Sequence, residues 1–238
     1  MLFLPDASFA TSYLGKRTLS LSRNAVKYMN RTSSYLKNNS MSIPLPPKFT
    51  SPEIEITAYV DASMGSSEDP HGTTGWVILA NGYPVTWRSK KQSRVSRSSL
   101  KAELIALHDL VDYLEWFCTV LSSSRVKSNT TIHSDSKDLV QLVNARHPKP
   151  GAKNDIFALD DIRKKIGIVP LASLDSSMQE LTRTNPTKLL HIPGSENPSD
   201  ALTKSANKIS LQTLIKTIQK ALPPHLRSTP RKRERGGE

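Results

Sequence analysis

Four acidic residues occupy positions where a carboxylate is hard to explain by packing alone. Asp61 and Asp135 each end a strand-like run of residues. Glu103 lies on the apolar side of a long amphipathic stretch, and Asp200 opens another helix-like stretch. Carboxylates gathered in one place repel one another and lose hydration. If these four converge, they indicate a bound divalent cation, and Mg²⁺ or Mn²⁺ suits oxygen ligands.

Two such ions, about 4 Å apart, form a standard device for cleaving a phosphodiester. Each acid taken alone has a simpler interpretation. Asp135 could cap the helix that follows it, and Asp200 could lie in a first helical turn. The occurrence of all four in one chain favours the metal site over these separate explanations.

The elements that must position these acids follow from the spacing of apolar residues. Asn81-Gly82 predicts a tight hairpin between two strands, and Ser98 or Ser99 is a candidate helix N-cap. Strands mixed with helices in this order predict an α/β fold with a mixed sheet. The expected strands are 53–61, 73–80, 83–89, 129–134 and 188–192, and the expected helices are 98–121, 136–145, 155–166 and one from Pro198.

Several short motifs accompany the four acids in a fixed order. They are GTTGWV at 72–77, PVTWRSKKQ at 84–92, SSLKAE at 98–103 and NPSDALTK at 197–204. Together they resemble the ribonuclease H domain of copia-type LTR retrotransposon polyproteins, over roughly residues 53–205. The resemblance implies a ribonuclease H-like fold, a five-stranded mixed sheet flanked by helices.

The resemblance also implies an activity, the metal-dependent endonucleolytic hydrolysis of the RNA strand of RNA–DNA hybrids. Asp61 would bridge two Mg²⁺ ions, with Mn²⁺ as an alternative. Glu103 and Asp135 would bind the ion nearer the leaving 3′ oxygen, and Asp200 would help hold the ion that activates water. His191 is open to two interpretations, a product-release histidine of the kind found in some cellular ribonucleases H or an ordinary strand residue.

Positive charge dominates the chain, which has 238 residues, a formal net charge of +12 and a pI near 9.8. Such a balance favours a polyanionic partner, here an RNA–DNA hybrid. A basic cluster with one aromatic residue precedes the Glu103 stretch and is the candidate nucleic-acid interface, unless it is only a solvated loop. The cluster comprises Trp87, Arg88, Lys90, Lys91, Arg94 and Arg97.

The chain divides into three parts on composition and resemblance. Residues 1–50 resemble the end of a reverse transcriptase region followed by a Pro-rich linker, with two expected helices. Residues 51–222 form the ribonuclease H-like domain, in which 167–187 is expected to be a surface insertion. Residues 223–238 are expected to be a disordered basic tail. Products of the same retrotransposon polyprotein are further candidate partners.

The single Cys118 excludes an intrachain disulfide and a multi-cysteine zinc site, and its apolar surroundings predict core packing. No apolar run is long enough for a membrane span, and no signal peptide is evident, so we expect a cytoplasmic or nuclear protein without a membrane partner. The alternative to an enzyme is an inactive transposon remnant or a co-opted nucleic-acid-binding protein.

Overall fold

A computed structural model gives the fold of the chain. The residues that it describes are 4–16, 22–39, 41, 43–46, 51–67, 69–146, 168–204, 208–222 and 224. The helix expected at 155–166 and most of the expected tail lie outside these residues.

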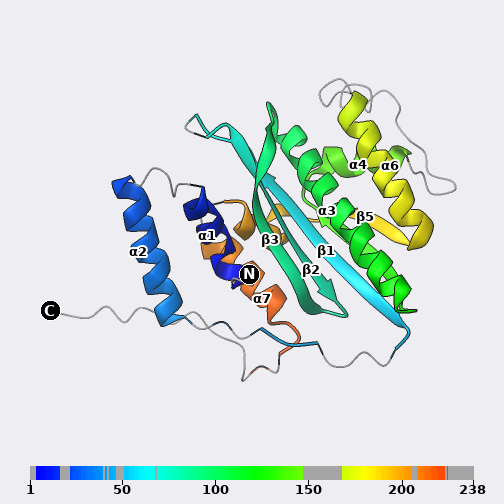
Figure 1. The fold of residues 1–238 in the computed structure, drawn as a ribbon, viewed down its shortest axis with the longest axis horizontal. Coiled ribbons are helices and arrows are strands. Elements are labelled where there is room, and N and C mark those ends of the chain that lie inside the picture. Colours follow the sequence, from blue (N-terminus) through cyan, green and yellow to red (C-terminus); the bar gives the residue numbers. More distant parts are fainter. Residues whose placement is uncertain are drawn as a thin grey trace.

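A five-stranded mixed sheet forms the centre of the molecule (Figure 1). Its strand order is β3-β2-β1-β4-β5; β1 pairs antiparallel with β2 and β2 with β3, while β1 pairs parallel with β4 and β4 with β5. The predicted α/β fold with a five-stranded mixed sheet is therefore confirmed. The strands are β1 (Glu53–Ser63), β2 (His71–Ala80), β3 (Tyr83–Val95), β4 (Lys127–Ser134) and β5 (Thr187–His191).

The hairpin between β2 and β3 forms where the sequence predicts it. Asn81 has φ of 49° and Gly82 has φ of 80°. Two successive positive φ angles are characteristic of the tight turns that match the twist of paired strands, and Asn-Gly tolerates them best. Beyond the hairpin β3 runs to Val95, six residues farther than expected, so the whole basic stretch before Ser98 is largely strand.

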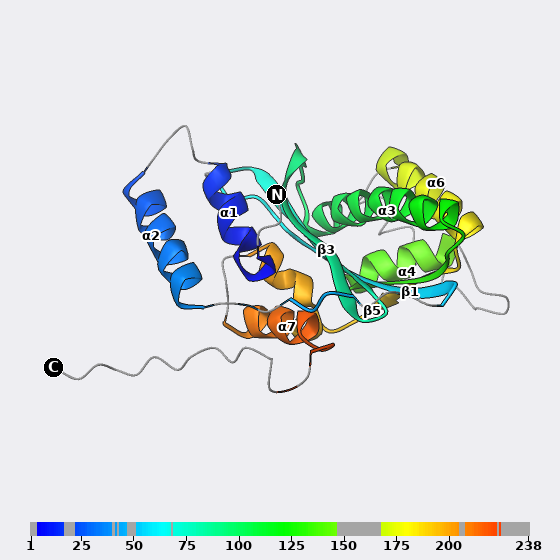
Figure 2. The ribbon, with the colours of Figure 1, turned by 60° about the horizontal axis from the view of Figure 1, so that its bottom comes forward.

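The first face of the sheet is covered mainly by the long helix α3 (Ser99–Ser123) and by α4 (Lys137–Arg146) (Figures 1 and 2). The Ser98 hydroxyl accepts a hydrogen bond from the Lys101 amide, which makes Ser98 the N-cap. Apolar residues at helical spacing along α3 are buried, and Cys118 is among them, as predicted. This helix is therefore fixed in rotation, and so is the direction of Glu103 near its start.

The segment 167–187 does not behave as the expected surface insertion. It forms helix α6 (Ile168–Thr184), which packs against α3, and its last residue begins β5. An apolar stripe of α6 completes the main core, and its Ser173 and Ser177 hydrogen-bond to His108 and Asp112 of α3. The polar composition of the segment is therefore compatible with close packing. Whether the segment is an insertion relative to other proteins stays a prediction. Among the α6 residues whose burial is described, the buried ones are Leu171, Leu174, Met178 and Leu181.

The second face of the sheet carries a smaller core to which the N-terminal segment contributes. The two helices expected in residues 1–50 are present as α1 (Ser8–Gly15) and α2 (Arg23–Asn38). Helix α1 contacts β3. Met41 is buried there beside Leu4 and Ile43, against residues of β2 and α7 (Lys208–Ile218). The boundary at residue 50 stays a prediction, but the described part of 1–50 does not stand apart from the domain.

The helix expected from Pro198 is interrupted. A short 3₁₀ helix, η3 (Pro198–Leu202), comes first, and α7 begins only at Lys208. Asn197 fixes η3 in place because its side chain accepts from the Ser199 amide and donates to the Val60 carbonyl at 2.9 Å. Asp200 is thus carried on a 3₁₀ turn held against the central strand.

Candidate metal centre

Asp61 lies near the end of the central strand β1 and is almost completely buried, at 1% exposure. Its carboxylate Oδ2 accepts a hydrogen bond from the Thr203 hydroxyl, just after η3. The neighbouring position on β2 is Gly75, and a Cβ there would lie 2.6 Å from Thr203 Cγ2 and 2.8 Å from Leu202 Cβ. Only a glycine lets η3 approach the sheet closely enough for this contact.

Glu103 reaches the same place from the first turns of α3. Its Oε1 accepts a hydrogen bond from the Ala62 amide at 3.3 Å, next to Asp61. Its Oε2 is buried and has no hydrogen-bond partner within the described residues. Gln92 anchors this end of the helix because its Nε2 donates to the Ala102 carbonyl at 2.9 Å and to the Thr74 hydroxyl at 3.2 Å.

Asp135 follows β4 directly, beside the end of β1. Ligand oxygens of Asp61, Glu103 and Asp135 all lie within 4.8 Å of one another. Gly194 packs against the Asp135 side chain, and a Cβ there would lie 3.0 Å from Oδ2. The structure therefore brings together three of the four predicted acids, from β1, α3 and the residue after β4.

Burial and like charges raise the pKa values of all three carboxyls. Burial raises the pKa of Glu103 to about 9, and the neighbouring Asp61 and Asp135 add to the rise. Burial raises the pKa of Asp61 to about 7 although Lys204 and Thr203 act to lower it. The pKa of Asp135 is raised by burial too, against the opposing effect of Lys204. Without a further cation, this site therefore holds protons near neutral pH.

Asp200 is close to the group but is not one of its three converging carboxylates. One of its oxygens accepts from the Lys204 ammonium and the other from the Ser210 hydroxyl of α7. Lys204 Nζ also lies 3.8 Å from Asp61 Oδ2. The ammonium of Lys204 thus joins the two aspartates, and its electrostatic partners raise its pKa against the effect of burial.

Four residues that contact the acids or support them received no role from the sequence: Thr203, Lys204, Ser210 and Gln92. The motifs at 197–204 and 84–92 include Thr203, Lys204 and Gln92. The sequence therefore pointed to these residues but did not show which atoms they would contact. Ser210 lies beyond those motifs, in α7, and only the fold brings it to Asp200.

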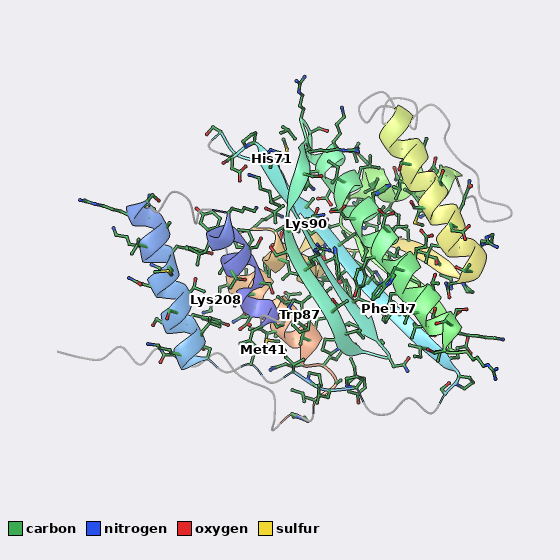
Figure 3. The ribbon with its side chains drawn as sticks, in the orientation of Figure 1. Met41, His71, Trp87, Lys90, Phe117 and Lys208 are labelled. Atoms are coloured by element: carbon green, nitrogen blue, oxygen red, sulfur yellow. The ribbon has the colours of Figure 1, made fainter. Side chains whose placement is uncertain are left out.

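The sheet divides the predicted nucleic-acid cluster between its two faces. Lys90 Nζ lies 3.5 Å from Asp109 of α3, whereas Lys91 Nζ lies 2.6 Å from Asp69 near the start of β2. Trp87 is partly buried in the smaller core near α1 and α7, while Lys90 lies farther along β3 (Figure 3). A nucleic acid lying over one face would therefore not touch the whole cluster. The exposed members are Arg88, Arg94 and Arg97.

The two histidines near the site differ in their surroundings. His133 of β4 stacks on Tyr59 with 5.0 Å between ring centroids, and burial lowers its pKa, as expected for a packed strand residue. His191 is exposed at the end of β5, where its electrostatic influence reaches Asp135. His191 is therefore in strand, but close enough to the acids to keep both of its interpretations open.

No protein-family model matches the chain. It is 24% identical over 170 residues to the Retrovirus-related Pol polyprotein from transposon RE2 of Arabidopsis thaliana, covering 69% of this chain and 10% of that protein. It is 25% identical over 218 residues to the corresponding RE1 polyprotein of the same plant, covering 90% and 14%. The chain is a relative of retrovirus-related Pol polyproteins.

Another relative is the Putative transposon Ty5-1 protein YCL074W of Saccharomyces cerevisiae, 35% identical over 117 residues, or 45% of this chain and 35% of that protein. Similar solved structures include RNase H1 from Halobacterium salinarum, with 22% identity, TM-score 0.39 and coverage of 63% and 94%. LC11-RNase H1, solved in complex with an RNA/DNA hybrid, has 18% identity, TM-score 0.43 and coverage of 66% and 99%. Among the helices of the described residues, none is long and apolar enough to cross a membrane.

Proposed function

We propose that the chain is a metal-dependent endonuclease of the ribonuclease H type that hydrolyses the RNA strand of RNA–DNA hybrids. The observation that carries the proposal is the convergence of Asp61, Glu103 and Asp135 from three separate elements. The relationship to Pol polyproteins supports the hybrid as substrate, because copying RNA into DNA produces such a duplex. The net positive charge of the chain suits a polyanionic substrate.

The donor set fits a hard divalent cation. Carboxylate oxygens are the ligands that Mg²⁺ and Mn²⁺ prefer, and Glu103 Oε2 is a buried oxygen left without a partner in the described structure. Asp61, Glu103 and Asp135 would hold one Mg²⁺, and Asp200 with Asp61 would hold a second, with Mn²⁺ as an alternative. When bound, the ions would activate water and stabilise negative charge on the phosphate.

The chain's own residues orient the acids for this role. The Thr203 hydroxyl and the Ala62 amide each occupy one carboxylate oxygen, on Asp61 and Glu103, and so fix how these side chains point. Lys204 supplies a positive charge between Asp61 and Asp200 that offsets part of their repulsion. Preorganisation of this kind reduces the cost of assembling like charges during the reaction.

The test is an assay of the purified chain on a hybrid labelled in its RNA strand. In Mg²⁺ or Mn²⁺ we expect internal cleavage of the RNA that leaves 5′ phosphates and 3′ hydroxyls, with no cleavage in EDTA. Asp61→Asn should abolish the activity, whereas Asp138→Asn, at an exposed acid in the first turn of α4, should not. RNA that stays intact with both metals would refute the proposal.

One observation favours a second function, a nucleic-acid-binding protein without catalysis derived from a transposon. Lys204 already places a cation among the acids, so the charged site has an internal partner without a metal. Such a protein would bind the hybrid in EDTA as well as in Mg²⁺ and would cleave it in neither. The same assay, read for binding and cleavage together, separates the two functions.

A further inference from the structure

A hollow of about 460 Å³ lies between the N-terminal helices and the sheet, beside the acidic site. In Figures 1 and 2, α1 lies between α2 and β3, and the two helices contact each other. The opposite wall comes from the end of β1, the loop after it and the start of β2, including Met64 and His71. The volume is within the range of about 300–1,000 Å³ that is usual for small-ligand sites.

Three aromatic rings line the helical wall of this hollow. Phe9 and Tyr13 of α1 stack with their ring centroids 6.0 Å apart, and Tyr13 meets Tyr28 of α2 at 5.0 Å. All three are only partly buried, so ring surface remains for a further planar group. A wall of this kind suits a nucleobase, because every base presents a face that can stack.

A lysine lies in the same hollow. Lys16 Nζ donates to the neutral hydroxyl of Thr73 at 3.1 Å, while the nearby Asp69 forms its ion pair with Lys91 at 2.6 Å. The ammonium of Lys16 is thus hydrogen-bonded to a hydroxyl, and Asp69 acts on it electrostatically while making its own close ion pair with Lys91. An anion in the hollow could therefore still pair with Lys16. A phosphate beside a stacked base meets this requirement.

The hollow is continuous with the acidic site. Two of its lining residues are Thr203 and Lys204, which contact Asp61 directly. A nucleic-acid strand whose phosphate lies at the acids would therefore reach the hollow with its neighbouring nucleotides. A paired base inside a duplex cannot offer its face to the aromatic wall, but an unpaired base can.

We propose that this hollow binds an unpaired nucleotide of the nucleic acid that occupies the acidic site, with the base against Tyr13 and Tyr28 and a phosphate at Lys16. The link to cleavage rests on the proposed function, whereas binding of the nucleotide does not. The natural ligand would be a hybrid that continues into a single-stranded flank.

The experiment measures binding by fluorescence anisotropy in EDTA, which prevents metal-dependent cleavage. A blunt RNA–DNA hybrid is compared with the same hybrid carrying a single-stranded extension on either strand. We expect the extension to tighten binding by wild type by about fivefold or more, the lower end of what one stacked base contributes. Tyr28→Leu should remove that gain while leaving affinity for the blunt hybrid unchanged.

Lys16→Gln is the second variant, since Tyr28 also joins the two helices. It should flatten the plot of log affinity against log salt by about 0.7 for the extended hybrid. Lys27→Gln is the matched control, because Lys27 is exposed on α2 and does not line the hollow. Its salt dependence should equal that of wild type.

Three results would overturn the inference: no gain from the extension, identical behaviour of Lys16→Gln and Lys27→Gln, or equal losses on blunt and extended hybrids. The last would mean that the hollow meets duplex backbone. A protein that shows the gain in EDTA but never cleaves RNA would retain this site and lose the proposed catalysis, so the two failures are distinguishable.

Discussion

Glu103 is the acid whose charge the fold disfavours most clearly. Burial, Asp61 and Asp135 all raise its pKa, and one of its oxygens has no partner within the described structure. We therefore expect Glu103→Gln to abolish hybrid cleavage while raising the melting temperature measured in EDTA. The rise should be about 2–4 °C for each kcal/mol of relieved repulsion in a chain of this size.

The same residue predicts a pH dependence of stability in EDTA. The pKa of Glu103 is about 9 in the folded protein against an ordinary 4.5, so the folded state retains a proton that the unfolded state loses. The contribution of this proton to the free energy of unfolding is fully present below pH ~4.5 and declines as the pH rises towards 9. The difference in melting temperature between Glu103→Gln and wild type should therefore widen over this interval, and a constant difference would contradict the assignment.

At the scale of elements, the approach of η3 to β2 depends on Gly75. We expect Gly75→Ala to lower both stability and cleavage, because its Cβ would collide with Thr203 and Leu202 and displace the hydroxyl that holds Asp61. A loss of roughly 1–3 kcal/mol is typical of overpacking. Thermal unfolding and the cleavage assay measure the two effects.

Gly15→Ala is the matched control for that substitution. Gly15 ends α1, and a Cβ there would meet nothing within 4 Å. Alanine favours helix, so this variant should be neutral or more stable by up to about 1 kcal/mol. Equal losses in the two variants would show that close packing of η3 is not the cause.

Strand β3 presents its neighbouring lysines to opposite faces of the sheet. Lys90 pairs with Asp109 and Lys91 with Asp69, so a duplex over one face reaches only one of them. We expect one of the single variants Lys90→Ala and Lys91→Ala to flatten the salt dependence of hybrid binding by about 1 and the other to leave it unchanged. Two equal effects, or none, would be inconsistent with this arrangement.

At the scale of the whole molecule, the described part of the N-terminal segment packs into the smaller core. Met41 is 8% exposed within the smaller core, whereas Met29 of α2 is 47% exposed. Met41→Ala should therefore cost about 2 kcal/mol or more of unfolding free energy, and Met29→Ala about 0.5 kcal/mol or less. Denaturant unfolding measures both, and a Met41→Ala variant as stable as wild type would make the segment a detachable leader.

Much of the fold follows from local patterns in the sequence. The β2–β3 hairpin is specified by Asn81-Gly82, and the rotation of α3 by the repeat of its apolar residues. Asp61, Glu103 and Asp135 could be selected as a candidate site because the two aspartates end strand-like runs and Glu103 borders an apolar helical stripe. Strand ends and helix faces are local properties, so these three predictions needed no knowledge of distant contacts.

Other features were decided only by the tertiary structure. Asp200 accepts hydrogen bonds from Lys204 and Ser210. Helix α6 buries apolar side chains in the main core, and Met41 is part of the smaller core that includes residues of α7. The hollow beside Lys16 likewise needs α1, α2 and the sheet together. The burial of a side chain and its contacts depend on which faces of the helices and the sheet pack together. Residues far apart in the chain determine that packing. The sequence by itself therefore determined most of the elements and three of the acids. Packing decided the fate of 167–187 and which charges, hydroxyls and aromatic rings surround the acids.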